Sequence, residues 1–290
     1  MKRVFIIAVA IVTLLVSAEA QKQKVGIVLS GGGALGFGHI GVLQALEDNG
    51  IYPTIVAGTS MGALVGAMYA NGLRPQDIFD LVKAEEFDKI SKIITPSGLR
   101  RGSMGISDHK NILDMLDKYI PANDFDSLKM PLYVCVSNIS KSQGEIIHSG
   151  GRLHEYLLAS SSIPLVFEAV ELDSMYYVDG GVFNNLPAQA IRDKCTYLIG
   201  SNVNPEKYRS PIKSGKDVAM RSVSILIYEN TKPGIEMCDF MVDVPVNYFY
   251  SPMDFKHFYE IYQIGYKAGL DYIKEHPEIV RKCKGKRPDW

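Results

Sequence analysis

The chain has 290 residues, is 47% hydrophobic and carries a formal net charge of −1 at pH 7. This length accommodates one large domain or two small ones, and no shift in composition divides it. The near-neutral charge excludes a global basic bias toward nucleic acid, so no nucleic-acid partner is expected.

The N-terminus has the pattern of a secretory signal peptide. Two basic residues precede the apolar run from Val4 to Val16, and the small residues Ala18 and Ala20 follow where a signal peptidase would read them. The run is shorter than the about 20 apolar residues that span a bilayer. We therefore expect residues 1–20 to be removed and the protein to be exported, either to the periplasm or outside the cell.

The next elements predict a strand, a helix and a second strand. Val25–Leu29 is apolar and β-branched, Ile40, Leu43 and Leu46 follow at helical spacing, and Thr54–Ala57 is again apolar. Two apolar strands joined through a helix form a βαβ unit. The sequence therefore predicts an α/β fold with a central, mostly parallel sheet that is covered on both faces.

A glycine-rich loop, Gly31-Gly32-Gly33, ends the first strand and has several interpretations. A dinucleotide site needs an acidic residue about 20 positions later, and residues 49–76 contain none. A phosphate-binding P-loop needs a lysine, and residues 25–82 contain none. The loop could also supply backbone amides to an oxyanion hole, or be a tight turn that simply requires glycine.

The segment Gly58-Thr59-Ser60-Met61-Gly62 has the G-x-S-x-G form of a nucleophile elbow. It falls between the second strand and the apolar helix predicted at Ala63–Ala70. Gly58 and Gly62 suit such a turn, because side chains at these places would collide and the serine backbone is strained. This position favours Ser60 as a nucleophile, and places the glycine loop one strand away from it.

Later elements follow the same patterns of apolar spacing and turn residues. One helix is predicted to begin at Arg74–Asp77 and another at Asp108, which would cap it, with a loop at Ser97–Ser107 between them. Four further strands are predicted: Met130–Val136, Met175–Val178, Tyr197–Gly200 and Met241–Val244. The predicted strand Met175–Val178 runs into Asp179-Gly180-Gly181. A carboxylate at a strand end followed by glycines is either a plain β-turn or a side chain projecting at the sheet rim, where α/β active sites lie.

The last helix carries an aromatic stripe that is interpreted as core, because such periodicity normally means packing: Phe255, Phe258, Tyr259, Tyr262 and Tyr266. A basic and frayed tail is expected from Arg281. The four cysteines lack metal-site spacing, although export permits disulfides: Cys135, Cys195, Cys238 and Cys283. Cys135 is interpreted as a small buried apolar residue. No calcium-loop motif and no His/Cys cluster is present in the sequence, so no metal and no cofactor is expected.

Four motifs in order resemble those of patatin-like phospholipases, a family of lipid acyl hydrolases. They are Gly31-Gly32-Gly33, Gly58-x-Ser60-x-Gly62, Ser160-Ser161-Ser162-Ile163-Pro164, and Asp179-Gly180-Gly181 with Asn184-Asn185-x-Pro187. The resemblance runs from about Val25 to Leu270. It implies a layered α/β/α domain over residues 21–275, followed by a basic tail at 276–290, in a secreted protein that consists of the catalytic domain.

The resemblance also implies roles for individual residues. Ser60 would be the nucleophile and Asp179 its partner in a dyad without a catalytic histidine. The amides of Gly31, Gly32 and Gly33 would form the oxyanion hole, and Gly58, Gly62, Gly180 and Gly181 would support the two turns. The substrate would be a lipid or membrane-derived acyl ester, reached through peripheral membrane contact.

Two places depart from the family pattern. Leu35 stands where the family usually has Arg or Lys, so any help from that cation is absent, and we expect Leu35→Arg to leave the fold intact. Asn138-Ile139-Ser140 replaces the Thr-Asp-Leu that commonly follows the middle strand, which could reshape the acyl groove.

A Ser–Asp dyad requires the carboxylate itself to take the hydroxyl proton, so partial burial that raises the pKa of Asp179 would make it a better base. One rival interpretation is an α/β-hydrolase triad of Ser60, Asp179 and His257, although the elbow stands too early in the chain for that fold. Another rival interpretation is a lipid-binding or storage protein that has lost activity. Its support is Leu35, which stands where the family usually has a cationic residue.

Overall fold

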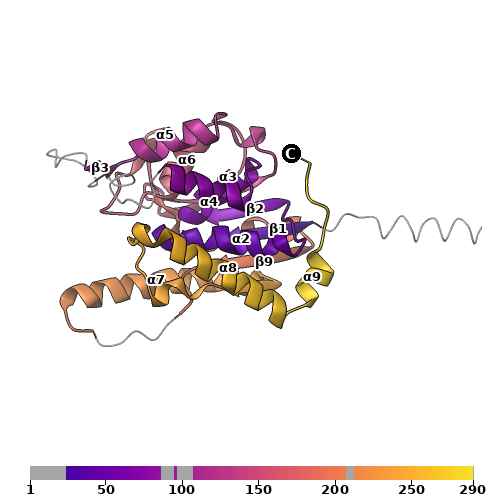
Figure 1. Ribbon diagram of the computed structural model, residues 1–290. Helices are drawn as coiled ribbons and strands as arrows, with labels where there is room; N and C mark the ends of the chain where they lie inside the picture. The colour runs from indigo at the N-terminus through magenta and orange to yellow at the C-terminus, as the bar shows by residue number, and fades with distance from the viewer. Residues whose placement is uncertain (1–23, 86–94, 97–106, 207–211, 290) are drawn as a thin grey trace, which may run out of the picture.

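The computed structural model describes residues 24–85, 95–96, 107–206 and 212–289 (Figure 1). The predicted signal peptide lies outside the described residues. So does the loop predicted at 97–107, apart from Ser107.

The centre of the fold is a mixed, mostly parallel sheet with strand order β10-β9-β1-β2-β5-β8-β7, in which β6 also pairs with β5. Five neighbouring strands are parallel: β10 (Phe240–Asp243), β9 (Tyr197–Asn202), β1 (Val25–Leu29), β2 (Ile55–Thr59) and β5 (Leu132–Asn138). The antiparallel strands are β6 (Gln143–Ile147), β7 (Val170–Leu172) and β8 (Met175–Asp179). A separate two-stranded sheet pairs β3 (Thr95–Pro96) with β4 (Ser107–Asp108). The predicted α/β fold with a mostly parallel central sheet is confirmed.

Alternating side chains of the parallel strands face two separate cores. In β1, Ile27 and Leu29 belong to the larger core, while Val28 belongs to the smaller one. The larger core also receives side chains from α2 (Phe37–Asp48), α3 (Met61–Ala70), α4 (Pro75–Ala84), α5 (Lys110–Tyr119), α6 (Leu153–Ser160) and α8 (Phe258–Glu275). The smaller core is closed by residues 186–195 and by the end of α7 (Gly215–Met237). Both faces of the sheet are therefore covered, as buried parallel strands require.

Helices α2 and α8 pack closely because glycines remove side chains from their contact. A Cβ atom on Gly41 would lie 2.2 Å from the carbonyl oxygen of Tyr262, and one on Gly265 would lie 2.0 Å from that of Gly38. The aromatic stripe is largely core, as predicted: Phe255, Phe258 and Tyr262 are buried and Tyr266 is half-buried, whereas Tyr259 is 55% exposed.

Three local predictions differ from the structure. Asp108 belongs to β4, and α5 begins after His109, whose side chain makes no capping hydrogen bond. The expected frayed tail is wrong at its start, because Glu278–Cys283 form α9 with Ile279 and Cys283 buried. The 23-residue helix α7 was not predicted from the sequence at all.

All four cysteines are free thiols, and Cys135 is buried as expected.

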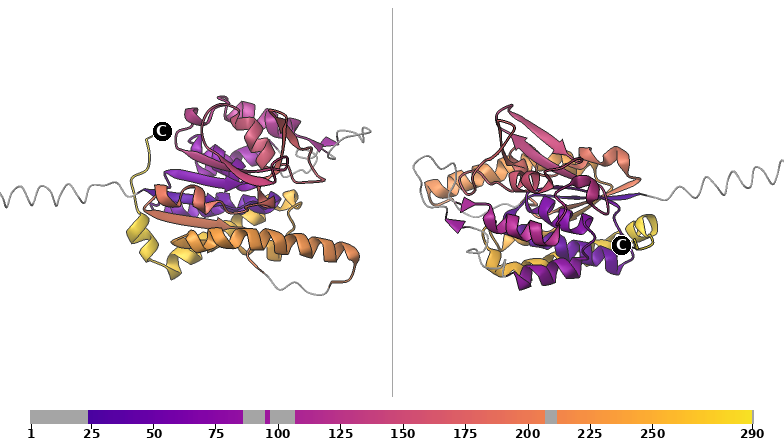
Figure 2. Two further views of the ribbon diagram at one scale, coloured as in Figure 1. Left: turned by 180° about the vertical axis from the view of Figure 1, so that it is seen from behind. Right: turned by 90° about the horizontal axis from the view of Figure 1, so that it is seen from above.

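The parallel strands place their following loops at one edge of the sheet. In the register of β1 and β2, Leu29 pairs with Gly58, so the glycine loop and Ser60 leave the sheet side by side. Figures 1 and 2 show the helices packed around this sheet. This edge of the sheet, where β1 and β2 end, is called the carboxyl edge below.

Candidate active site

Ser60 has the backbone conformation of a nucleophile elbow, with φ 55° and ψ −128° between β2 and α3. A positive φ is uncommon for a residue with a side chain and costs on the order of 1–3 kcal/mol. The flanking glycines are required by space. A Cβ atom on Gly58 would lie 2.6 Å from the carbonyl oxygen of Gly62, and one on Gly62 would lie 2.5 Å from those of Leu29 and Ser30.

A second serine holds the strained turn in place. The Ser60 amide donates to Oγ of Ser160 at 2.9 Å, and that hydroxyl donates to the carbonyl oxygen of Cys135 at 2.7 Å. Ser160 is fully buried and belongs to the Ser160–Ser162 motif at the end of α6. The motif therefore links the elbow to β5 through one side chain.

Asp179 reaches Ser60 from the antiparallel strand β8. Strand β5 lies between β2 and β8, and the pairing of Cys135 with Thr59 and of Val136 with Asp179 sets Asp179 level with the end of β2. Its amide donates to the carbonyl oxygen of Ser162 at 2.9 Å. The Ser60 hydroxyl lies near enough to the carboxylate to lower its pKa, and the Gly181 amide donates a hydrogen bond to it at 2.8 Å. The structure thus brings together the serine and the aspartate that the sequence singled out.

Burial raises the pKa of Asp179 from 3.8 to about 6, because a charged carboxylate loses hydration inside the protein. The Ser60 hydroxyl and the Gly181 amide act in the opposite direction, and burial outweighs them. Asp179 is 8% exposed and Ser60 is 3% exposed. The carboxylate is therefore a stronger base than an ordinary aspartate, while it is still ionised above neutral pH.

The glycines after Asp179 are also required by space. A Cβ atom on Gly180 would lie 2.3 Å from the carbonyl oxygen of Cys135. One on Gly181 would lie 3.0 Å from Oδ1 of Asn185 and 3.1 Å from Oδ1 of Asp179 itself. Side chains at these positions would push the aspartate away from Ser60.

The glycine loop lies against the elbow, but one of its three amides is already engaged. A Cβ atom on Gly31 would be 3.1 Å from that of Ser60. The Gly31 amide donates to the carbonyl oxygen of Asn185 at 3.1 Å, so it is not a free donor for an oxyanion. No acceptor among the described residues is recorded for the amides of Gly32 and Gly33. Gly33 has φ 55° and opens a short 3-10 helix that leads into α2.

Leu35 has a structural role that the sequence did not indicate. It is 1% exposed and lies in the larger core. The expectation that Leu35→Arg leaves the fold intact is therefore wrong, since the substitution would bury an unpaired charge. The other departure, Asn138, is also buried, and it organises the β5–β6 hairpin by donating to Glu145 at 3.0 Å and accepting from the Lys141 amide at 3.0 Å.

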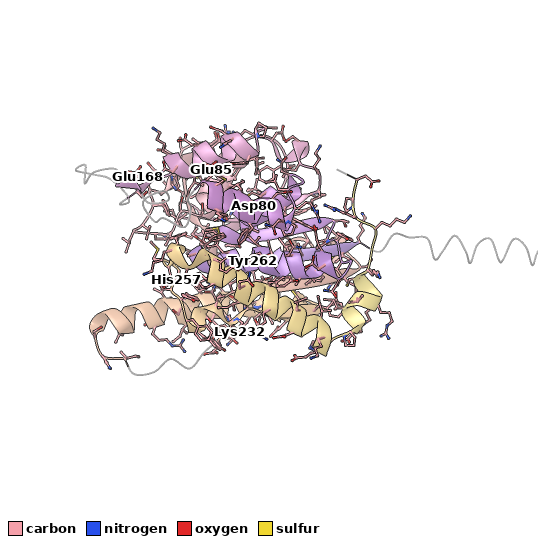
Figure 3. All side chains as sticks on the ribbon, viewed as in Figure 1. Asp80, Glu85, Glu168, Lys232, His257 and Tyr262 are labelled. Atoms are coloured by element: carbon pink, nitrogen blue, oxygen red, sulfur yellow. The ribbon has the colours of Figure 1, made fainter. Side chains whose placement is uncertain are left out.

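Two histidines near the carboxyl edge make other contacts. His39 is fully buried, and because Nε2 lies 2.8 Å from the Ser30 carbonyl oxygen it donates there, while Nδ1 accepts from the Ser201 hydroxyl at 2.8 Å. Burial lowers the pKa of His39 to about 4, so it is neutral at pH 7. His257 lies at the start of α8 (Figure 3), where its ring packs 4.8 Å from that of Tyr250. Its recorded ion pair is with Glu260, at 3.7 Å.

Three polar residues that support the site were not assigned a role from the sequence. Asn204 donates to the carbonyl oxygen of Gly31 at 2.5 Å, and Asn185 donates to the Thr231 hydroxyl at 3.2 Å. Asn185 and Thr231 are buried. The Asn184-Asn185-x-Pro187 motif could have identified Asn185, whereas Asn204 and Thr231 lie outside any motif.

An apolar cavity of about 50 Å³ begins beside the elbow. Met61, the residue after Ser60, is part of its wall, and α2, α3, α4 and α5 supply the rest: Phe37, Ile40, Leu64, Val65, Met68, Ile78, Val82, Ile112 and Met115. All of these side chains are apolar. Methionines can repack around a flexible guest, so this wall is chemically suited to hydrocarbon, while its volume is well below the about 300 Å³ of a small ligand pocket.

A family model described as patatin-like phospholipase matches residues 27–191. The match includes the glycine loop, Ser60 and Asp179. Lysophospholipase NTE1 of Kluyveromyces lactis is 27% identical over 293 residues, which cover 88% of this chain and 20% of that protein. Lysophospholipase NTE1 of Saccharomyces cerevisiae is 27% identical over 287 residues, covering 87% of this chain and 16% of that protein.

The chain thus spans about a fifth of the length of these curated relatives. Among solved structures, VipD from Legionella pneumophila is similar with a TM-score of 0.56 and 17% sequence identity. The similarity covers 89% of this chain and 68% of that one, and it shows a shared fold.

Proposed function

The chain belongs to the patatin-like phospholipase family, and we propose that it is a serine lipid acyl hydrolase that works through a Ser60–Asp179 dyad. The observation that carries this proposal is the proximity of the Ser60 hydroxyl, at the strained turn after β2, to a buried aspartate whose pKa is raised to about 6. A serine hydroxyl needs such a base to become a nucleophile. Family membership implies an esterase activity, and the residue roles are our proposal.

The reaction would proceed in two halves. Asp179 takes the Ser60 proton as Oγ attacks the ester carbonyl, and the amides of Gly32 and Gly33 stabilise the negative oxygen. When the C–O bond breaks, Asp179 returns the proton to the leaving alcohol, which produces an acyl-Ser60 ester. Asp179 then takes a proton from water as it attacks this ester, and returns it to Ser60 as the free acid leaves.

We propose that the substrate is a lipid or membrane-derived acyl ester. The support is the wholly apolar wall of the cavity that begins at Met61, directly after the nucleophile. An acyl chain held there would exclude water from the ester, whereas a small polar ester would gain nothing from this wall. The relatives named as lysophospholipases make a lysophospholipid the first lipid to try.

The geometry gives less support to the two rival functions. In the triad, His257 should hydrogen-bond Asp179, but the recorded contacts of His257 are with Tyr250 and Glu260. The inert lipid-binding protein rested on Leu35, and that side chain packs in the core while both dyad residues are in place. Labelling of Ser60 by a fluorophosphonate probe would separate an active hydrolase from an inert binder.

The decisive measurement is kcat/KM on one soluble ester for Ser60→Ala, Asp179→Asn and His257→Ala, with folding checked by circular dichroism. Ser60→Ala and Asp179→Asn should each abolish turnover, and the double variant should be scarcely worse, because the two groups act as a unit. His257→Ala should retain most activity, as should the control His276→Ala at the other end of α8. Loss of activity in a folded His257→Ala variant as complete as in Ser60→Ala would replace the dyad by the triad.

We also propose that the protein is exported. The support is the basic, apolar and small-residue order of residues 1–20. Mass spectrometry of the protein from cell fractions and culture medium should find a mature N-terminus at Gln21 outside the cytoplasm. An intact Met1 on cytoplasmic protein alone would contradict export.

A further inference from the structure

The segment Ser160–Ser162 at the end of α6 contacts both residues of the proposed dyad. The Ser160 hydroxyl accepts from the Ser60 amide at 2.9 Å, and the Ser162 carbonyl oxygen accepts from the Asp179 amide at 2.9 Å. All three serines of the segment are buried. The position of this short segment therefore sets how the nucleophile and the carboxylate stand relative to each other.

A histidine from a distant part of the chain binds this segment. Nε2 of His109 lies 2.8 Å from Oγ of Ser162, across 53 residues of sequence. The same hydroxyl lies 2.7 Å from the carbonyl oxygen of Leu158, and a carbonyl oxygen can only accept. The hydroxyl proton is therefore used on Leu158. It follows that Oγ of Ser162 accepts from His109, and that Nε2 of the imidazole carries the proton.

The imidazole ring of His109 is itself held in place. It stacks on the ring of buried Phe167, with the centroids 5.3 Å apart and the planes at 18°. The nearby Ser107 makes two backbone hydrogen bonds on either side of Phe167: its amide donates to the carbonyl oxygen of Val166 at 2.9 Å, and its carbonyl oxygen accepts from the Glu168 amide at 3.1 Å. His109 directly precedes α5, which lies beside α6 (Figure 1). A ring fixed in this way loses little further side-chain entropy when it donates to Ser162.

The dyad depends on such support because an aspartate side chain is short, so its carboxylate follows its backbone. A shift of the Ser162 carbonyl oxygen would move the Asp179 amide that it accepts from, and with it the carboxylate. The same shift would reach Ser60 through Ser160. A misplacement of about 1 Å between reacting groups can cost about a hundredfold in rate.

We propose that His109 is a positioning residue of the hydrolase: by donating from Nε2 to Ser162, it fixes the segment that holds Ser60 and Asp179 in register. The inference rests on the proposed function, since only a reaction at the dyad makes this register matter. His109 acts through Ser162 and is neither the base nor the nucleophile. It also lies outside the four sequence motifs that contain the other residues of the site.

The test compares two substitutions of His109 in the full mature chain. His109→Phe keeps an aromatic ring to stack on Phe167 but has no donor, whereas His109→Gln keeps an N–H donor at a similar reach. On one soluble short-chain ester, His109→Phe should lower kcat at least about tenfold with little change in KM, because positioning acts in the transition state. His109→Gln should stay within about threefold of wild type. The matched control is His148→Phe, an exposed histidine whose ring packs 4.7 Å from that of Tyr133, and its kcat should be unchanged.

A double-mutant cycle shows whether His109 acts through Ser162. Ser162→Ala removes the side-chain acceptor and keeps the backbone carbonyl that binds Asp179. The double variant of His109→Phe with Ser162→Ala should lose no more kcat than the worse of the two single variants, because each removes the same hydrogen bond. Losses that multiply in the double variant would overturn the proposal.

A second readout does not depend on turnover. The titration of the Asp179 carboxylate is followed by NMR of protein labelled at its aspartate carboxyl groups, and its signal is assigned by its absence from Asp179→Asn. Burial is the largest cause of the raised pKa of Asp179. A loosened segment admits water, so the midpoint should fall from about 6 toward 3.8 in His109→Phe and stay at the wild-type value in His109→Gln.

Circular dichroism and urea unfolding establish that each variant is folded. A folded His109→Phe variant with wild-type kcat, or with the wild-type Asp179 midpoint, overturns the positioning role alone, as does a His109→Gln variant as impaired as His109→Phe. No ester turnover by wild type, with a midpoint that falls in His109→Phe and not in His109→Gln, overturns the proposed function alone. Should His109→Phe not fold, Ser162→Ala removes the same hydrogen bond from its other side and is judged by the same kcat and midpoint.

Discussion

Asp179→Asn tests whether one buried carboxylate is both the base of the reaction and a cost to the folded state. Burial raises the pKa of Asp179 from 3.8 to about 6. A tenfold change in an acid dissociation constant corresponds to about 1.4 kcal/mol, so keeping this group ionised costs the folded protein about 3 kcal/mol at pH 7 and above. Asparagine has nearly the same shape without the charge and should remove that cost.

The sign of the pH dependence follows from proton binding. Between about pH 4 and pH 6 the folded state holds the Asp179 proton and the unfolded state has released it, so wild-type stability falls as pH rises through this window. Below the window the group is protonated in both states, and above it the group is ionised in both. The free energy of unfolding of Asp179→Asn relative to wild type should therefore grow by roughly 2 to 2.5 kcal/mol from pH 4 to pH 7.

The assay is urea unfolding followed by circular dichroism for both proteins across this window, with kcat/KM on a soluble ester measured in parallel. Wild-type kcat/KM should fall as pH drops through about 6, because protonated Asp179 cannot accept the serine proton. Asp173→Asn is the control, since its hydrogen bond with exposed Arg152 lowers the pKa of Asp173 and gives the opposite sign. A stability difference for Asp179→Asn that is flat with pH, or near-wild-type turnover in that variant, would refute the reasoning.

Three further predictions follow from the cavity, the core and the reacting groups. Met115→Trp should reduce kcat/KM on a hexadecanoate ester at least about tenfold by filling the apolar cavity, and leave an acetate ester unchanged; equal losses on both esters would contradict an acyl-chain site. Leu35→Arg should lower the free energy of unfolding by about 3 kcal/mol or more, whereas Leu35→Met should cost under about 1.5 kcal/mol, both read from urea unfolding. Hydrolysis should persist in EDTA, because Ser60 and Asp179 supply the nucleophile and base, and a complete loss that calcium restores would count against the dyad.

The parts of the site that could be predicted are those fixed by short-range geometry. The G-x-S-x-G spacing constrains the backbone of Ser60 locally, and the structure has the positive φ and the two crowded glycines that this spacing requires. Asp179 could be placed at a strand end for the same reason. The continuous apolar runs of β1 and β2 likewise predict strands that are covered on both faces, and both strands are buried throughout.

Contacts between distant segments were beyond such reasoning. The Gly31 amide is taken by the carbonyl oxygen of Asn185, and nothing near Gly31 in the sequence indicates that acceptor. From the sequence, Leu35 could only be compared with the Arg or Lys that the family usually has at this position. In the structure its role is to pack in the larger core. Helix α7 could not be predicted from the sequence, because its apolar residues do not recur at the spacing that places them on one face of a helix.

The same long-range contacts explain how an unfavourable site persists. Ser60 has a strained φ and Asp179 carries a charge that burial disfavours, so neither would hold its place by local preference. Ser160 holds the first through its hydroxyl, and the Gly181 amide holds the second. Asn230 then reaches the same turn from α7, with its hydrogen bond to Val182. The turn that carries Asp179 is thus also a point where α7 joins the fold, so the position of this carboxylate depends on contacts from three distant segments.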